Sequence, residues 1–185
     1  MSSVWRIEFN PDHLYFITTR AVQKAHLFQR EVMKMIVLDS WDFMRREKWL
    51  ELYCFVVMPN HVHFIVKCNP SHPVQYMVRD FKKYTSKKII AQYEAEGNTR
   101  VLEFLKAAVE RPDKQTHAVW EDDYMAKDVY SAWFLKEKMN YIHNNPLQPH
   151  WNLVEQPQDY EWSSARFYLL DEPAVIPVDD ARLLL

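Results

Sequence analysis

The chain has 185 residues, a formal net charge of −2 and a high apolar and aromatic content, which together indicate one globular domain with a full-sized core. The small negative charge gives no support to nucleic-acid binding through bulk basicity, so any such binding must depend on local patches. The single glycine, Gly97, excludes the dinucleotide-binding and P-loop signatures, because each of them needs several glycines.

The sequence shows no sign of membrane insertion or export. No apolar run approaches the ~20 residues that a membrane span requires, and residues 1–6 lack the charged-then-apolar pattern of a signal peptide. We therefore expect a cytoplasmic protein without membrane contact. In a reducing compartment Cys54 and Cys68 are expected to be small core residues rather than a disulfide.

The spacing of apolar residues predicts the secondary structure along the chain. In order, we expect a strand over residues 14–19, a helix over 28–49, a strand over 52–57, a second hairpin strand after the turn at 59–60, a long helix over 73–96, a short helix over 101–109, a polar connection over 111–116, short strand pieces at 119–120 and 127–130 around an acidic turn, and a last major helix over 131–145.

Helix-end signals support these boundaries. Pro73 suits the first turn of the second long helix, Gly97 suits its end, Ser131 is a plausible cap of the last major helix and Pro146 is its stop. The order of elements favours an α+β fold, a ferredoxin-like antiparallel sheet with helices packed on it. We expect residues 1–170 to form one domain and residues 171–185 to form a C-terminal arm docked on its surface.

The most informative stretch is MPNHVHFIV at residues 58–66. Side chains of a strand alternate between faces, so His61 and His63 lie on the same face. A neutral imidazole pair on one face is half of a divalent-metal site. The motif alone also fits zinc hydrolases, double-stranded barrel oxygenases and hydrogen-bonded strand histidines, so these interpretations remain open.

A second motif, KMNYIHNNP at residues 138–146, closes the last major helix. Tyr141 and Asn145 are four residues apart and therefore share a helix face. The amide oxygen of Asn145 is an acceptable third ligand for Mg²⁺ or Mn²⁺, and a phenol can serve as a nucleophile once a metal and a phosphodiester are placed before it. In the alternative interpretation Tyr141 packs in the core and the asparagines cap carbonyls.

Four sequence blocks, taken together, identify a family. They are YFITTR at residues 15–20, VMPNHVH at 57–63, YIHNNP at 141–146 and YEWSSA at 160–165. In this order they resemble the single-tyrosine HUH transposases, or IS200-like transposases, and within them the REP-associated tyrosine transposases, which handle bacterial palindromic repeats. The resemblance spans nearly the whole chain.

The resemblance implies a metal-dependent single-stranded DNA endonuclease and strand transferase with a ferredoxin-like core. It implies His61 and His63 as paired metal ligands, Asn145 as the third ligand, and Tyr141 as the nucleophile that forms a 5′-phosphotyrosine. The implied cofactor is Mg²⁺ or Mn²⁺. The implied partner is a single-stranded DNA hairpin from a palindromic repeat, bound by a monomer or a homodimer.

The chain departs from the family near Trp120, which matches a family tryptophan usually followed by glutamine and a basic residue. Here the acidic residues 121–123 follow, which puts any DNA contact at that point in question. Tyr124 lies nearby and is a competing nucleophile, but it lacks an amide one turn later.

A run of lysines on the second long helix is the candidate DNA-contacting surface. Its members are Lys82, Lys83, Lys87 and Lys88, and Arg79 and Arg20 are further candidates for the same groove. The alternative for such a run is a solvated helix face.

Two other functions remain open at this point. One is a catalytically silent DNA-binding protein, such as a domesticated transposase. The other is a zinc hydrolase built on His61 and His63, although no further histidine or carboxylate clusters near that strand.

Overall fold

The computed structural model describes residues 8–185, and the expectation for residues 1–6 lies outside this range. The described residues form four strands and five α-helices, which in chain order are β1 (Leu14–Arg20), α1 (Glu31–Arg46), β2 (Leu50–Val57), β3 (His61–Cys68), α2 (Val74–Ala95), α3 (Thr99–Ala107), β4 (Met125–Val129), α4 (Ala132–Asn144) and α5 (Ala165–Leu170). Within residues 8–185, no helix is long and apolar enough to cross a membrane.

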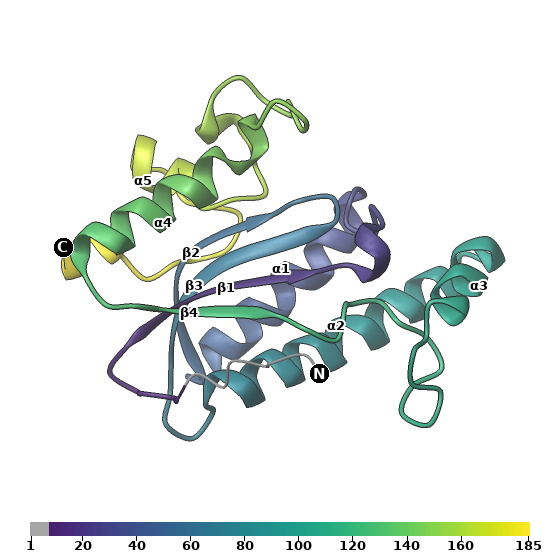
Figure 1. Cartoon of the computed structure of the whole chain (residues 1–185). Helices are drawn as coiled ribbons and strands as arrows, with labels where there is room; N and C mark the ends of the chain where they lie inside the picture. Colours follow the sequence, from purple (N-terminus) through teal and green to yellow (C-terminus); the bar gives the residue numbers. More distant parts are fainter. Residues whose placement is uncertain (1–7) are drawn as a thin grey trace.

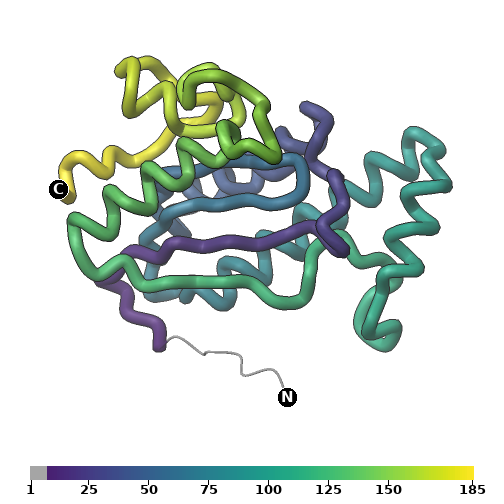
Figure 2. The backbone as a smooth tube through the Cα atoms, turned by 45° about the horizontal axis from the view of Figure 1, so that its top comes forward, coloured from purple at the N-terminus to yellow at the C-terminus, as the bar shows by residue number. Residues whose placement is uncertain are grey.

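The strands form an antiparallel sheet in the order β2-β3-β1-β4. Helices α1 and α2 cover one face of this sheet, and α4 with the C-terminal segment covers the other (Figures 1 and 2). The prediction of an α+β, ferredoxin-like antiparallel sheet is therefore confirmed. The additional layer formed by α4 matters for function, because it covers the face onto which β3 directs its histidines.

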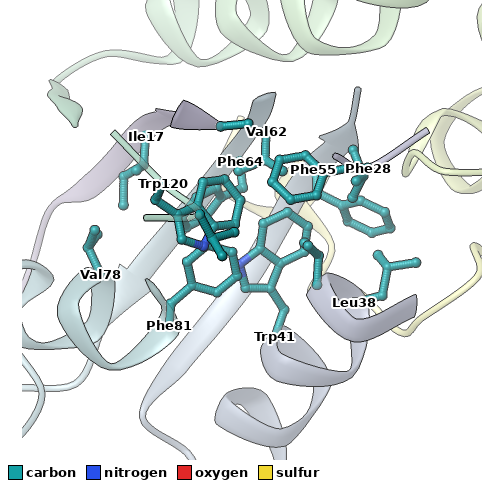
Figure 3. Close-up of a cluster of buried hydrophobic side chains, with 14 of the residues drawn as sticks. Ile17, Phe28, Leu38, Trp41, Phe55, Val62, Phe64, Val78, Phe81 and Trp120 are labelled. Carbon is teal, nitrogen blue, oxygen red and sulfur yellow. The ribbon is translucent and has the colours of Figure 1, made fainter. Parts of the chain in front are cut away.

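The core on the α1/α2 face is aromatic. The ring of Trp41 from α1 is fully buried and lies 4.8 Å from Phe64 of β3 and 5.5 Å from Phe81 of α2, measured between ring centres. Figure 3 shows these rings facing one another between the helices and the sheet, with Phe55 and Trp120 beside them. The aromatic cluster fixes both helices against the sheet.

The core on the α4 face is smaller and mixes aliphatic with aromatic side chains. Alternate strand residues contact the buried stripe of α4, and the main participants are Phe16, Cys54, Val56, Ile65, Leu135, Met139 and Ile142. Cys54 and Cys68 are both free and buried, as expected from the sequence.

The predicted helix ends are close to the observed ones. The Oγ of Ser131 accepts a hydrogen bond from the backbone N–H of Phe134 at 3.1 Å, which caps α4 as predicted. Gly97 follows α2 with a positive φ of 62°, a conformation that favours glycine. Pro146 does not end the helical conformation at once, because Asn145–Leu147 continues α4 as a short 3-10 helix.

One expected strand piece is nearly absent from the structure, and one observed helix was not expected. The expected strand piece at residues 119–120 is reduced to an isolated bridge between Trp120 and Ala21. Helix α5 was not expected, because its six residues are too few to show a helical period.

The segment before α5 covers the outer edge of the sheet. The backbone N–H of Val57 in β2 donates to the carbonyl of Trp162 at 2.9 Å, and the Tyr160 hydroxyl donates to the carbonyl of Val57 at 2.8 Å. Residues 171–185 lie against the same strand, since Asp179 accepts from the Leu52 N–H at 2.9 Å and pairs with Arg45 at 3.0 Å. An otherwise open edge strand is thereby protected.

We predict that Trp41→Ala lowers the free energy of unfolding by about 3–5 kcal/mol, because it leaves a large void at the centre of the aromatic cluster. The matched control is Trp133→Ala on α4, where the side chain is 68% exposed, and a change within about 0.5 kcal/mol is expected. Urea denaturation measures both. Equal decreases in the free energy of unfolding of the two variants would contradict the central position of Trp41.

Candidate active site

The two histidines of β3 lie on the sheet face that α4 covers. Their ring centres are 4.7 Å apart, and His63 is only 4% exposed, whereas His61, the first residue of β3, is partly buried. Strand alternation predicted the shared face, and the covering helix explains why both rings lose much of their contact with water.

His63 is anchored by the neighbouring strand. The β1–β3 register sets Thr18 directly opposite His63, and the Thr18 hydroxyl lies 2.7 Å from Nδ1 of His63. The ring of Phe16 stacks on the same imidazole at 5.6 Å between centres. These contacts occupy Nδ1 and leave Nε2 as the ring nitrogen for another partner.

His61 is oriented by a short chain of hydrogen bonds. The side-chain N–H of Asn60 donates to the carbonyl of Lys24 at 3.1 Å, which turns the amide oxygen of Asn60 toward His61. The Nδ1–H of His61 then donates to this oxygen at 2.6 Å. In that tautomer Nε2 carries a lone pair, and it lies 3.2 Å from Oδ1 of Asn145.

Both histidines are neutral at pH 7. Burial lowers the pKa of His61 to about 4. The contact with Asn145 opposes this effect, and the nearby charges of Arg20 and His150 lower the pKa to a smaller extent. Burial also lowers the pKa of His63 well below its ordinary value. A neutral imidazole is the form that binds a metal ion.

Asn145 is buried, with 4% exposure, directly after α4. Its backbone remains helical, with φ −58° and ψ −42°, so the four-residue spacing from Tyr141 keeps both residues on one face. Its amide oxygen and Nε2 of His61 are two acceptors that face each other. Adjacent ligands of an octahedral ion with bonds of about 2.1 Å are about 3 Å apart, so the residues present fit a divalent cation.

Tyr141 lies at the open side of this group. Its ring centre is 5.1 Å from that of His63 and 6.0 Å from that of Phe16, and the side chain is 44% exposed. The interpretation in which Tyr141 packs in the core is therefore wrong. The fold brings His61, His63, Asn145 and Tyr141 together from two segments that lie far apart in the sequence.

Lys138 is a neighbour of Tyr141 that the sequence analysis missed. It precedes Tyr141 by one helical turn, and its ammonium lies 5.8 Å from the Tyr141 ring centre and 5.7 Å from that of Phe16. The same ammonium pairs with Glu137 at 2.7 Å. The three-residue spacing from Tyr141 was the available signal.

The lysine run of α2 divides into two groups. The ammonium of Lys82 donates to the carbonyls of Glu121, Asp122 and Asp123 at 2.8, 3.1 and 3.1 Å, and burial lowers its pKa to about 8. This placement speaks against the expected contact of Lys82 with DNA. Lys83, Lys87 and Lys88 are exposed.

The two expected arginines differ in their surroundings. Arg79 is exposed and forms a two-pronged ion pair with Asp80 at 2.8 and 3.1 Å. Arg20 is exposed at the end of β1, opposite His61 in the strand register. Of the expected basic residues, Arg20 is thus the one paired in register with a histidine of the candidate site.

Trp120 and Tyr124 pack in or against the hydrophobic core and do not belong to this site. Trp120 is 5% exposed, and its indole N–H donates to the hydroxyl of Thr85 at 2.9 Å. Tyr124 packs against the core on the α1/α2 face, the opposite face of the sheet from the histidines. Its placement speaks against a nucleophile that acts with His61 and His63.

Within residues 8–185, no group of three or more histidine, cysteine, aspartate or glutamate side chains could hold a metal ion. Any further protein ligand beside His61 and His63 would have to be another kind of group, and the amide of Asn145 is in contact with His61 at 3.2 Å.

Comparison with known proteins identifies the family. The family model described as "Transposase IS200 like" matches residues 10–145. The chain belongs to this family. The predicted family is thus confirmed, and the matched range contains His61, His63, Tyr141 and Asn145 and ends at the last of them.

The fold is similar to solved structures. A REP-associated tyrosine transposase bound to a REP hairpin shares 17% identity over 96% of this chain and 93% of that one, with a TM-score of 0.62. A candidate transposase from Deinococcus radiodurans R1 shares 18% identity over 78% of this chain and 96% of that one, with a TM-score of 0.45. A search of curated proteins finds no significant match.

We predict that His61 stays neutral in the metal-free protein from pH 7 down to pH 5, because burial lowers its pKa to about 4. NMR chemical shifts of its ring, assigned with His61→Gln, measure the titration. The ring shifts should change little over that range and move only below pH 5. A midpoint near the ordinary value of ~6.5 would contradict the burial of this imidazole.

Proposed function

We propose that the protein is a metal-dependent single-stranded DNA endonuclease and strand transferase that forms a 5′-phosphotyrosine at palindromic or hairpin DNA. The observation that carries this proposal is the position of the exposed Tyr141 ring, 5.1 Å from His63 and on the face that also holds His61 and Asn145. A nucleophile beside a potential metal-ligand set is what phosphodiester transfer requires.

Three side chains would hold the ion: His61 and His63 through Nε2, and Asn145 through Oδ1. When bound, Mg²⁺ or Mn²⁺ supplies Lewis-acid polarisation of the phosphate and neutralises its charge. Asn60 and Thr18 orient the two imidazoles from behind, at 2.6 and 2.7 Å from their Nδ1 atoms. Such supporting hydrogen bonds fix the tautomer and the ring orientation of a metal-binding histidine.

Tyr141 performs the covalent step. Its phenolic oxygen attacks the phosphorus, the bond to the leaving 3′-oxygen breaks, and the phenol proton passes to solvent while the leaving oxygen takes up a proton to become a 3′-hydroxyl. A second 3′-hydroxyl can attack the phosphotyrosine, which restores Tyr141 and joins the strands. The ammonium of Lys138, 5.8 Å from the Tyr141 ring centre, stabilises negative charge that develops during the attack.

The DNA partner is inferred from charge and from similarity. The similar REP-associated transposase is bound to a REP hairpin, and we extend this kind of partner to the present chain. Lys83, Lys87 and Lys88 are exposed on α2 and suit phosphate contacts, with Arg79 beside them. Because α2 covers the sheet face opposite the histidines, these residues do not share a groove with Arg20, which alone among the expected cations lies at the candidate site. Since the net charge is −2, these local patches must provide the attraction.

The other two functions receive less support. A catalytically silent DNA-binding protein has no need of an exposed tyrosine beside a buried histidine, a partly buried histidine and a buried amide. A zinc hydrolase needs a further histidine or carboxylate at the metal site, and the described residues supply an amide instead.

We predict that Tyr141→Phe abolishes the covalent adduct with a labelled single-stranded DNA hairpin while DNA binding is retained, because only the attacking oxygen is lost. A denaturing gel detects the adduct, and fluorescence anisotropy measures binding. Tyr124→Phe is the matched control and should form the adduct normally. An adduct that persists in Tyr141→Phe and disappears in Tyr124→Phe would reverse the assignment, and no adduct with the unmodified protein in Mn²⁺ would favour the silent DNA-binding protein.

We predict that Thr18→Val weakens Mn²⁺ binding by about 10–100-fold, because it removes the group that orients His63. Thr19→Val is a closely matched control. Thr19 is equally buried, its hydroxyl has no partner among the described residues, and strand alternation directs it to the opposite face. Isothermal titration calorimetry with Mn²⁺ compares the two variants, and equal affinities would exclude an orienting role for Thr18.

A further inference from the structure

We infer that Trp151, flanked by His26 and His150, forms a stacking wall for one unpaired nucleobase next to the scissile phosphate. The inference rests on the proposed function and deepens it, since it names a base-binding subsite of the same active site. The family match ends at Asn145, so Trp151 and His150 lie in a part of the chain that the family model does not cover, whereas His26 lies within the matched range.

The wall adjoins the metal-ligand candidates directly. The ring centre of Trp151 lies 5.9 Å from that of His61, 5.5 Å from that of His26 and 5.5 Å from that of His150. His26 comes from the segment after β1, whereas Trp151 and His150 come from the loop after α4. Figures 1 and 2 show both segments at the end of the sheet where the β2–β3 turn lies.

Backbone hydrogen bonds hold the loop that carries Trp151 in place before any DNA arrives. The N–H groups of Trp151 and Asn152 both donate to the carbonyl of Gln148, at 2.8 and 2.9 Å, and Asn152 adopts a positive φ of 45° that closes this turn. The turn is tied back to the end of α4, because the Leu153 N–H donates to the Pro146 carbonyl at 3.0 Å. A preorganised ring loses little conformational entropy when a base stacks on it.

The wall is also accessible. Trp151 is partly buried against the α4-side core, whereas His26 and His150 are exposed. Arg20 is exposed as well and lies opposite His61 in the strand register, so a cation is available for the backbone of the same nucleotide. Aromatic faces next to a cation are the usual means of holding single-stranded nucleic acid, and each stacked base contributes about 1–3 kcal/mol.

A purely structural role for Trp151 and a base-stacking role predict different effects of its removal on DNA binding. If the indole only shields His61 from water, its removal weakens metal binding and acts equally on every DNA ligand. If it stacks on a base, its removal weakens DNA binding only when that base is present. An abasic nucleotide, which keeps the sugar and phosphate but lacks the base, separates the two roles.

The experiment measures anisotropy of a fluorescein-labelled DNA hairpin with a single-stranded thymidine extension, in Mn²⁺, with all proteins carrying Tyr141→Phe to prevent cleavage. One abasic nucleotide is moved through the extension. We expect Trp151→Leu to weaken binding of the intact hairpin by about 5–100-fold. At one position the abasic hairpin should bind both proteins equally. Trp151→Phe should retain most of the affinity, and Trp133→Leu at an exposed position of α4 should leave it unchanged.

Three outcomes would overturn the inference: an unchanged affinity in Trp151→Leu, a loss of equal size on every abasic hairpin, or no measurable binding of the hairpin by the parent protein. A parallel Mn²⁺ titration of Trp151→Leu identifies loss of metal as the cause of the second outcome. The adduct assay with intact Tyr141 is independent of this binding experiment. Base-dependent binding without any adduct would therefore refute the proposed catalysis and leave the stacking wall in place.

Discussion

The antiparallel pairing of β1 with β3 determines where a site can form in this fold. It places Thr18 opposite His63 and Arg20 opposite His61, so the imidazoles, the orienting hydroxyl and a cation share one face. A slip of one residue would turn both histidines toward Trp41 and the aromatic core of α1 and α2. Because Val62 and Phe64 alternate with the histidines and are buried in that core, the packing of one face holds the polar residues of the other in register.

Local spacing explains which features could be predicted from the sequence. The His61/His63 pair and the Tyr141/Asn145 pair each lie within one element, so the periods of a strand and a helix suffice to place them. The contact between Thr18 and His63 joins residues 45 positions apart, and the contact of Trp151 with His26 depends on two loops. Neither contact produces a periodic pattern in the sequence, so both became visible only in the structure.

The acidic departure after Trp120 has a structural explanation. Lys82 binds the backbone carbonyls of residues 121–123, and Thr85, one turn further along α2, binds the indole of Trp120. The carboxylates also favour the nearby ammonium, which burial would otherwise tend to neutralise. A run of lysines in the sequence therefore contains one residue that fastens a loop and others that face solvent, and only burial and partners distinguish them.

The candidate site combines the buried His63 and Asn145 and the partly buried His61 with the exposed Tyr141. Burial keeps His61 and His63 neutral, and the hydrogen bond from Nδ1 of His61 to Asn60 leaves its Nε2 without a hydrogen, facing the Asn145 oxygen. Two facing acceptors destabilise the face that holds them, and a cation between them would reverse this effect. The large aromatic core on the other face supplies stability that this arrangement lacks, so the sheet can hold His61, His63 and Asn145 in place while Tyr141 stays exposed.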